Sequence, residues 1–302
     1  MIQLHPGGNY VILDPFRKII CRRESGPWCN PDPVAMHERM NTMNNYRSFA
    51  VIIYVTEMEK QAVLRMFDWT DLHMEGDTQA YQEAFVSREG RLRVISAQQD
   101  EMGMTASASL TAKMIFHFAP EYVVMPGIAA GTGNAIALDR DQEYGDVLLA
   151  TSVWNFSNGK YVSPHQAEII FGEIGFNPRP TVVSISGDYM RKIREFIGSD
   201  RNEYHVHTGP LASGTAVVAN RSLLTKQVVT SFRDTQGVEM EGYGVAYAAS
   251  HAVDPKPHII IAKSVCDFAD ERKDDKYQKF AAYTSCSFVR DLLERVLPYD
   301  GV

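Results

Sequence analysis

Cysteine is scarce in this chain, and its few cysteines are not spaced like metal or redox motifs. Four occur among 302 residues, namely Cys21, Cys29, Cys266 and Cys286. No two of them form the C-x-x-C spacing that is typical of zinc sites and thioredoxin-like centres. We therefore expect free thiols in a reducing cytoplasm.

Long apolar runs and an excess of positive charge are also missing. No apolar run is long enough to cross a bilayer, and residues 1–8 lack the basic start and apolar core of a signal peptide. The formal charge of -7 disfavours binding to nucleic acid or to an anionic membrane. Hydrophobic content of 45% with 22% charged residues is typical of a soluble protein. We expect a cytoplasmic protein whose ligand is a small molecule, and a local basic cluster would still allow that ligand to be an anion.

Residues 1–47 differ in composition from the rest of the chain, because prolines and glycines interrupt them repeatedly. Two short stretches, Tyr10–Leu13 and Lys18–Cys21, flank Asp14-Pro15-Phe16-Arg17 and predict a small hairpin. We expect residues 1–47 to form an arm that packs on the main domain or on a partner subunit. Residues 48–302 are then one α/β domain.

Strand-like and helix-like segments alternate from Ser48 onward. The continuous apolar run Phe49–Val55 predicts a buried parallel strand, and Glu57–Phe67 predicts the helix that follows it. The alternation continues through residues 92–96, 105–118, 122–125, 147–150, 237–251, 259–265 and 277–297. Such alternation predicts an α/β fold with a central sheet flanked by helices.

Two stretches are predicted to be loops. Met125–Asn134 follows a strand and holds Gly127, Gly131 and Gly133, which permit the backbone to approach a ligand closely. A tight turn without a ligand is equally typical of such a stretch. Trp154–Tyr161 is predicted to be a loop with a polar tip, and Pro178-Arg179-Pro180 interrupts another.

Three carboxyl groups in the last third of the chain are candidates for ligand binding and catalysis. Glu239 and Glu241 are two residues apart, so on an extended segment they share one side and can both accept hydrogen bonds from a ribose diol or a water. Asp267 follows the apolar run His258–Ala262, and open α/β sheets bind ligands at the carboxyl ends of such strands. These groups suit the breaking of an N-glycosidic bond.

Several of the candidate residues also have a simpler structural interpretation that needs no ligand. Glu59, directly after the first predicted strand, is typical of a first-turn helix glutamate. Asp267 is also typical of a helix N-cap, although Asp270 fits that position better. Met240 is typical of simple core packing.

Several motifs together resemble the nucleoside phosphorylase superfamily, in particular its methylthioadenosine/S-adenosylhomocysteine nucleosidase branch. Val238-Glu239-Met240-Glu241 is similar to that branch's ribose motif, and Cys266-Asp267-Phe268-Ala269-Asp270 is similar to its Ser-Asp-x-Ala-Asp catalytic loop. The resemblance extends over roughly residues 48–297. It includes Met125-Pro126-Gly127-Ile128-Ala129-Ala130-Gly131, Tyr144-Gly145-Asp146-Val147 and Ala212-Ser213-Gly214-Thr215.

The resemblance implies a three-layer phosphorylase-type α/β fold and assigns roles to individual residues. Asp267 would be the general acid at the purine, while Glu59 and Glu239 would present the hydrolytic water. Glu57 is the neighbouring alternative to Glu59 in this role. Glu241 would bind the ribose hydroxyls, with Met240 packed beneath the sugar. The remaining substrate contacts that it implies are Ala129, Gly131, Val217, Val218 and Cys266.

The chain departs from the family pattern at three points. The glycine stretch offers Ile128-Ala129-Ala130 and no basic residue, which favours water over phosphate as the acceptor. Val217 and Val218 stand where family members often place an aromatic ring, so we expect the base to be held differently. Cys266 replaces a common serine, and a weaker donor there loosens the orientation of Asp267.

The segment from Trp154 to His165 is an insertion relative to the small nucleosidases. It resembles a subgroup found as effector domains in bacterial defence proteins, whose members act on adenine nucleotides such as ATP. Lys160 and His165 are the donors that this segment offers to a 5′ phosphate tail, with Arg140, Arg179 and Lys263 also expected near the mouth. Arg17, Lys18, Arg22 and Arg23 cluster in the arm.

We therefore expect hydrolysis of an adenine nucleotide or nucleoside with release of adenine, with ATP or AMP favoured and with an antiphage effector role implied. The alternatives are a methylthioadenosine/S-adenosylhomocysteine nucleosidase, a purine nucleoside phosphorylase, and a sensor without catalysis. No metal and no organic cofactor are expected, because acid-base and electrostatic catalysis suffice. A homodimer or larger homo-oligomer is expected, with defence proteins as further partners.

Overall fold

A computed structural model describes residues 2–4, 10–14, 17–20, 47–86, 91–133, 142–171, 174–269 and 275–297. The chain divides into two compact units, Met1–Asn44 and Asn45–Val302. In the first unit, the strands β1 (Ile2–Leu4), β2 (Tyr10–Asp14) and β3 (Arg17–Ile20) form an antiparallel sheet in that order. The predicted hairpin is confirmed, with Val11 opposite Ile20. Arg22 and Arg23 lie outside the described residues.

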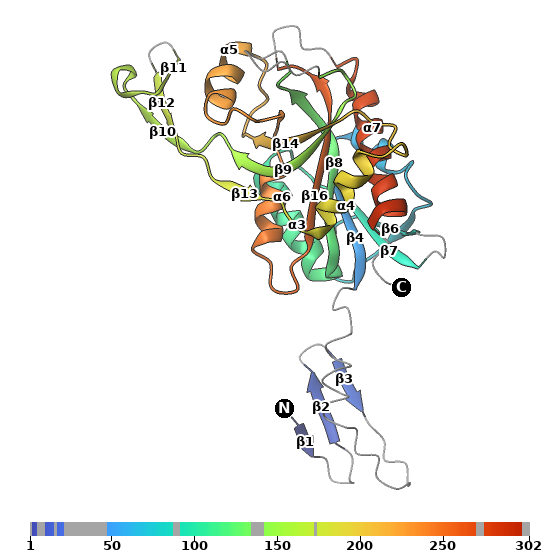
Figure 1. The fold of residues 1–302 in the computed structure, drawn as a ribbon. Helices are drawn as coiled ribbons and strands as arrows, with labels where there is room; N and C mark the ends of the chain where they lie inside the picture. The colour runs from blue at the N-terminus through green and yellow to red at the C-terminus, as the bar shows by residue number, and fades with distance from the viewer. Residues whose placement is uncertain are drawn as a thin grey trace. The chain divides into compact units, whose positions relative to one another are not determined.

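The second unit is built on one mixed sheet (Figure 1). Its strands lie in the order β13-β9-β14-β15-β8-β4-β7-β6-β5, and β16 pairs with both β8 and β9. Their bounds are β4 Ser48–Tyr54, β5 Thr70–Leu72, β6 Tyr81–Val86, β7 Leu92–Gln98, β8 Pro120–Gly131, β9 Val147–Asn155, β13 Val182–Ser184, β14 Val206–Ser213, β15 Gly237–Glu239 and β16 His258–Asp267.

The centre of this sheet is parallel and apolar on both faces. Strand β4 runs parallel to β7 and β8, and β16 runs parallel to β8. Ile52, Val123 and Ile261 have no exposed surface, because helices cover both faces of these strands. The continuous apolar runs of the sequence follow from this double cover.

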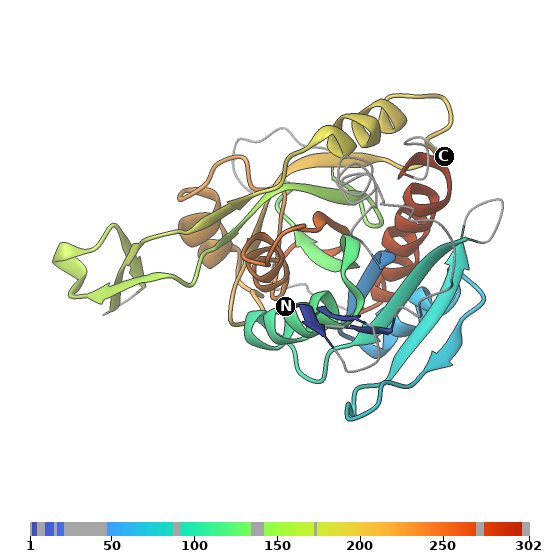
Figure 2. The same cartoon turned by 90° about the horizontal axis from the view of Figure 1, so that it is seen from below.

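Helices flank both faces of the sheet, and the fold is three-layered as predicted (Figures 1 and 2). α2 packs against α7 on one face, whereas α3 packs against α6 on the other. None of the helices in the described ranges is long and apolar enough to cross a membrane. The bounds are α2 Glu57–Val63, α3 Met104–Phe118, α4 Asp188–Ile197, α5 Arg221–Leu223, α6 Gly242–Ser250 and α7 Gln278–Asp291, with 3-10 or π turns at Pro164–Gln166, Leu224–Val229 and Leu292–Val296.

The glycine stretch is not a loop, contrary to the prediction. Strand β8 continues through it to Gly131, where β15 and β16 take up its backbone hydrogen bonds. Gly127 has a φ of 145°, a conformation that side chains disfavour, so the strand keeps its pairing only because this residue is glycine.

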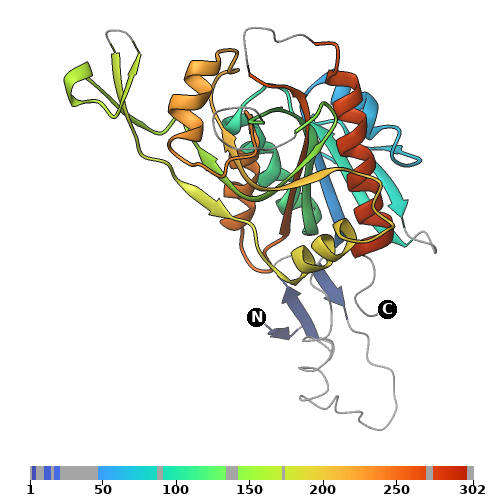
Figure 3. The ribbon, with the colours of Figure 1, turned by 45° about the horizontal axis from the view of Figure 1, so that its top comes forward.

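The prediction of a loop at Trp154–Tyr161 is also wrong at both ends. Trp154 lies in β9 and is fully buried, with its indole N–H donating to Thr235 Oγ1 at 3.0 Å. Beyond the turn, β10 (Gly159–Val162), β12 (Ile174–Pro178) and β11 (Ile169–Phe171) form a separate small antiparallel sheet. We call this sheet the β-arm, and it projects from the edge of the main sheet (Figure 3).

Candidate active site

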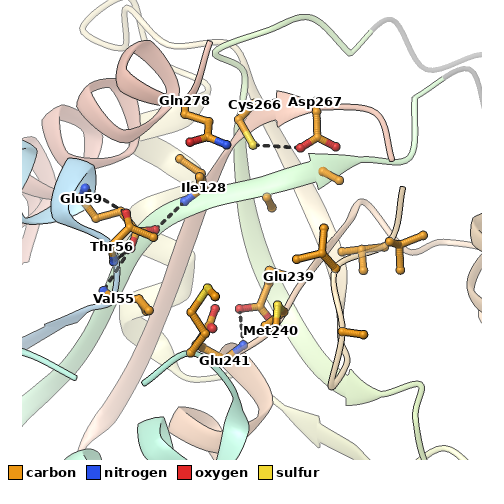
Figure 4. Close-up of a pocket in the computed structure, with 17 residues that line it drawn as sticks. Val55, Thr56, Glu59, Ile128, Glu239, Met240, Glu241, Cys266, Asp267 and Gln278 are labelled. Atoms are coloured by element: carbon orange, nitrogen blue, oxygen red, sulfur yellow. Dashed lines mark hydrogen bonds between the residues drawn. The ribbon is translucent and has the colours of Figure 1, made fainter. Parts of the chain in front are cut away.

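A cavity of about 280 Å³ opens where several strands of the main sheet end (Figure 4). This volume is near the lower end of the range for small-molecule sites. The described residues that line it include no lysine, arginine or histidine. They are Val55, Thr56, Glu59, Met102, Ile128, Ala129, Ala130, Ala216, Val217, Val218, Val238, Glu239, Met240, Glu241, Cys266, Asp267 and Gln278.

Glu59 is held by a capping box at the start of α2. Thr56 is the N-cap, and its hydroxyl accepts from the Glu59 N–H at 3.2 Å. In return Glu59 Oε2 accepts from the N–H groups of Thr56 at 2.9 Å and Val55 at 3.0 Å. Glu59 Oε1 accepts from the Ile128 N–H at 3.0 Å, across the cavity floor on β8. The helix-start interpretation is thus confirmed, and the same carboxylate also lines the cavity, while its role toward water stays a prediction.

Gly127 lets the Glu59 carboxylate approach the backbone of β8. A Cβ atom at this position would overlap Glu59 Oε1 and would lie 2.9 Å from Lys263 Nζ. The Glu59 carboxylate and the Lys263 ammonium group therefore both lie next to Gly127, on the side where a side chain would stand.

Glu239 is engaged on both carboxylate oxygens. Oε1 accepts a short hydrogen bond from Ser213 Oγ, while Oε2 accepts from the N–H groups of Glu241 at 3.0 Å and Gly242 at 2.7 Å. These amides belong to the amino end of α6, where a negative charge is favoured. Glu239 thus positions the start of α6 through the Glu241 and Gly242 amides, and its role of presenting water stays a prediction.

Glu241 is the N-cap residue of α6, and only 7% of it is exposed. Its Oε1 accepts from the Gly103 N–H at 2.9 Å, and its carbonyl oxygen accepts from Ser107 Oγ at 3.0 Å. Burial raises the pKa of Glu241 from 4.5 to about 7, with Glu239 adding to the rise and Lys263 opposing it. Near neutral pH this carboxyl can therefore either accept or donate a hydrogen bond, which suits a sugar hydroxyl.

Lys263 lies fully buried beneath the cavity, in the middle of β16. Its Nζ is 3.6 Å from Glu239 Oε2 and has no hydrogen-bond partner among the described residues. Burial alone would lower the pKa of Lys263, but the carboxylates of Glu239, Glu59 and Glu241 outweigh it and raise the pKa. Lys263 is therefore charged, and it offsets part of the negative charge of the three glutamates.

Asp267 stands at the carboxyl end of β16 and is 4% exposed. Its Oδ1 accepts from the Ala269 N–H at 2.8 Å, and its Oδ2 accepts from the Cys266 thiol at 3.3 Å. Ala269 has a left-handed backbone with φ of 51°, which closes the turn around the carboxyl group. These local bonds fix Asp267 at the cavity wall (Figure 4). Asp270, the alternative cap, lies outside the described residues.

The predicted substrate contacts fall into two groups. Ala129, Met240, Val217, Val218 and Cys266 line the cavity together with the carboxyl groups. Gly131 is not among the lining residues. A Cβ atom there would lie 2.7 Å from Gln142 Oε1 and 3.1 Å from the Phe268 ring, which gives this glycine a packing role.

The predicted donors to a phosphate tail do not line the cavity. Lys160 lies in β10 of the β-arm, where it is exposed and opposite Asn177, and His165 lies in the short turn Pro164–Gln166. The role of Lys160 and His165 as substrate contacts is thus not supported by their place in the single chain. Arg140 lies outside the described residues.

Sequence reasoning missed three features of the cavity. Thr56 carries a readable signal, because a threonine three residues before a glutamate is a capping-box pattern. Lys263 was expected near the mouth, but its burial among three glutamates was missed, although a charge inside an apolar run indicates a partner of opposite charge. Met102 and Gln278 come from segments with no motif that could have indicated them.

Comparisons with known proteins support the family resemblance and the fold. A family model described as "Phosphorylase superfamily" matches residues 52–298. The uncharacterized protein y4jS of Sinorhizobium fredii is 29% identical over 76% of this chain and 56% of its own length. The ATP nucleosidase Cap17 of Escherichia coli is 22% identical over 68% of this chain and 42% of its own length. The chain thus spans only about half of each relative.

A solved structure supports the fold. The crystal structure of Helicobacter pylori 5′-methylthioadenosine/S-adenosylhomocysteine nucleosidase has a TM-score of 0.63 and 21% identity. The match covers 82% of this chain and 98% of the nucleosidase chain.

Proposed function

The chain belongs to the phosphorylase superfamily, and on that premise we propose that it hydrolyses the N-glycosidic bond of an adenine nucleoside or nucleotide and releases adenine. The observation that carries the proposal is the meeting of Glu59, Glu241 and Asp267 in one cavity, above a buried Lys263. Each group has a separate task in the reaction.

Asp267 is the general acid. Departure of adenine as a neutral base requires a proton at the purine ring, and a carboxyl group at hydrogen-bond distance can deliver it. Ala269 and Cys266 hold the two oxygens of Asp267 in place at the cavity wall. The thiol is a weak donor, so its hydrogen bond to Oδ2 competes little with a proton shared between Oδ2 and the base.

Glu59 and Lys263 position the water. Three backbone N–H groups fix the Glu59 carboxylate, and Lys263 Nζ approaches the same spot over Gly127. A water between the two would donate to Glu59 and accept from Lys263. The ammonium group would thus orient the nucleophile, while the glutamate takes its proton as the water attacks the ribosyl cation.

Glu241 holds the ribose. Its carboxyl group faces the cavity from the start of α6, and Met240 beside it offers an apolar surface to the sugar. Hydrogen bonds to the sugar hydroxyls strengthen as positive charge develops on the ring, which stabilises the transition state. Glu239 supports this arrangement through its bonds to the Glu241 and Gly242 amides.

Water is favoured over phosphate as the acceptor. A bound phosphate dianion needs charge-assisted donors to offset its desolvation. The described residues that line the cavity provide no basic side chain, and the nearby Lys263 is already surrounded by glutamates. This argues against a phosphorylase.

The proposal also concerns which chemical group the substrate carries on the 5′ carbon of its ribose. A nucleotide tail is favoured by the similarity to the ATP nucleosidase Cap17, and it would fit the antiphage effector role that the resemblance implies. An uncharged tail, as in methylthioadenosine, is favoured by the apolar lining at Val55, Met102 and Val217. This lining is the observation that keeps a methylthioadenosine-type nucleosidase as the second candidate.

One assay tests both the hydrolysis of the N-glycosidic bond and the identity of the group on the 5′ carbon. The protein is incubated in phosphate-free buffer with ATP, AMP, methylthioadenosine or S-adenosylhomocysteine, and free adenine is measured. Adenine with ribose products from any of them supports hydrolysis, and the substrate that reacts identifies the tail. Turnover that requires added phosphate and yields ribose 1-phosphate would reject the hydrolase. Release of no base from any substrate would favour a sensor.

A further inference from the structure

Two histidines and an aspartate converge at the first residues of β9 and β14, outside the set of residues that line the cavity. Asp146 directly precedes β9, His205 directly precedes β14, and His207 lies in β14. None of the three is among the residues that line the cavity. Strands β9 and β14 are parallel, with Val147 opposite Val206, so their first residues lie side by side. His205 and His207 are two residues apart on an extended segment and therefore share one side of it.

The three side chains have the geometry of metal ligands. Asp146 Oδ2 lies 3.0 Å from His205 Nδ1 and 2.8 Å from His207 Nε2, and all three ligand atoms lie within 4.8 Å of one another. In a tetrahedral zinc site with bonds of about 2.0 Å, neighbouring ligand atoms are roughly 3.3 Å apart. The two distances from Asp146 Oδ2 would each have to lengthen by only a few tenths of an ångström, on the order of 0.4 Å, to admit such an ion.

Hydrogen bonding alone explains this cluster poorly. Asp146 Oδ2 also accepts from the Glu143 N–H at 2.9 Å, so three nitrogens converge on one oxygen. A carboxylate oxygen has about two acceptor sites, so three donors exceed its capacity. A cation shared by the two imidazoles and the carboxylate replaces the two ring protons and removes this excess.

We propose that Asp146, His205 and His207 bind a divalent transition-metal ion of the zinc type. Two imidazole ligands favour such ions over magnesium or calcium, which prefer oxygen ligands. The Glu143 N–H orients the carboxylate, as groups next to metal ligands commonly do. His207 is largely buried whereas the His205 side chain is 64% exposed, so an ion could enter from solvent and keep a water as its fourth ligand.

The site connects to the strand that carries Asp267. The Gly145 N–H donates to the Val265 carbonyl at 2.9 Å, and the Val265 N–H donates to the Asp146 carbonyl at 2.9 Å. Val265 stands two residues before Asp267 in β16. An ion at Asp146 would therefore fix the starts of β9 and β14 against the end of β16. Its role is structural, and it does not depend on the proposed reaction.

Metal binding to the full chain tests the proposal directly. The protein is purified without a polyhistidine tag, treated with a chelator, and titrated with Zn²⁺ by equilibrium dialysis. We expect one tightly bound ion per chain and a rise in Tm, because an ion that binds only the folded state stabilises it. Binding of Co²⁺ should give the visible absorption bands of a site with nitrogen ligands.

Single variants show whether these residues are the ligands. His205→Ala should fold normally, because its side chain is mostly exposed, and should weaken Zn²⁺ binding by at least about 100-fold, since loss of groups beside the ligands alone costs 10- to 100-fold. His207→Ala should weaken Zn²⁺ binding by a similar factor. His73→Ala, which removes an exposed histidine elsewhere, is the control and should bind as the parent does. Absence of stoichiometric binding, or equal binding by His205→Ala and the parent, would overturn the proposal.

Discussion

Lys263 Nζ lies 3.6 Å from Glu239 Oε2, and neither side chain has more than 1% of its surface exposed. A buried ion pair of this kind contributes little net stability, because desolvation of both charges opposes their attraction. Removal of one partner is far more damaging, since the other charge is then buried alone. The presence of a buried lysine is better explained by the cavity beside it. Lys263 offsets the negative charge of Glu239 and of two further carboxyl groups, those of Glu59 and Glu241.

The first prediction concerns Lys263. Lys263→Met should lower the free energy of unfolding by about 3–5 kcal/mol, because three carboxyl groups lose their counter-charge. Urea unfolding measures this effect. Base release by the folded fraction should also fall. Lys263→Arg, which keeps the charge, should restore most of the stability. A fully stable and active Lys263→Met protein would contradict both the charge argument and the water-positioning role.

The second prediction concerns Gly127. Gly127→Ala should abolish most activity, because its Cβ would overlap Glu59 Oε1 and crowd Lys263 Nζ, and because φ of 145° disfavours alanine. The matched control is Gly198→Ala, where the nearest atom is 3.6 Å away and the backbone is unstrained. Steady-state kinetics on both variants gives the comparison. Equal activities would mean that Glu59 does not need this close approach.

The third prediction concerns Asp267. Asp267→Asn should reduce base release by about 10²–10⁴-fold, because an amide cannot supply the proton that a general acid gives. The amide can still accept from the Ala269 N–H, so the circular dichroism spectrum and Tm should change little. Adenine release near the unaltered rate from a folded variant would remove Asp267 from the mechanism.

The sequence predicted the architecture well for a physical reason. Buried parallel strands such as β4 and β16 must be apolar on both faces, so they appear as continuous runs at residues 49–55 and 258–262. The glycine stretch was predicted as a loop because glycine is rare inside strands. In the fold, Gly127 belongs to a strand since only glycine leaves space for the Glu59 carboxylate.

The site was only partly predictable. The carboxyl groups of Glu59, Glu241 and Asp267 follow strands or begin helices, and such positions can be read from local patterns. The role of Lys263 depends on three residues that are distant in sequence, so no local pattern contains it. The β-arm was hidden because its short strands alternate poorly and carry prolines and glycines.

The fourth prediction concerns Lys160, which lies on the β-arm and outside the cavity. Lys160→Ala should change the KM for ATP and for an uncharged adenosine analogue by the same small factor. Its exposed side chain also makes a large stability change unexpected. A KM increase confined to ATP would show that the β-arm reaches a phosphate tail, in its own subunit or in a partner.

The fifth prediction concerns Glu241, whose pKa rises from 4.5 to about 7 on folding. The folded protein therefore holds this proton more tightly than the unfolded chain does. The stabilising contribution of the protonated group is complete below pH 4.5 and is lost as the pH rises to about 7. The loss amounts to about 3 kcal/mol, because one pKa unit corresponds to about 1.4 kcal/mol.

Glu241→Gln tests this directly, since the amide is uncharged at every pH and can still accept from the Gly103 N–H. The variant should lose the part of the pH dependence of stability that lies between pH 4.5 and 7, and it should unfold at a higher Tm than the parent at pH 8. Thermal unfolding from pH 5 to pH 8 measures both. The ribose contact would be weakened, so the same variant should release adenine more slowly. Parallel stability curves for variant and parent would show that Glu241 titrates as an ordinary surface glutamate, and the buried-carboxyl account of the site would then fail.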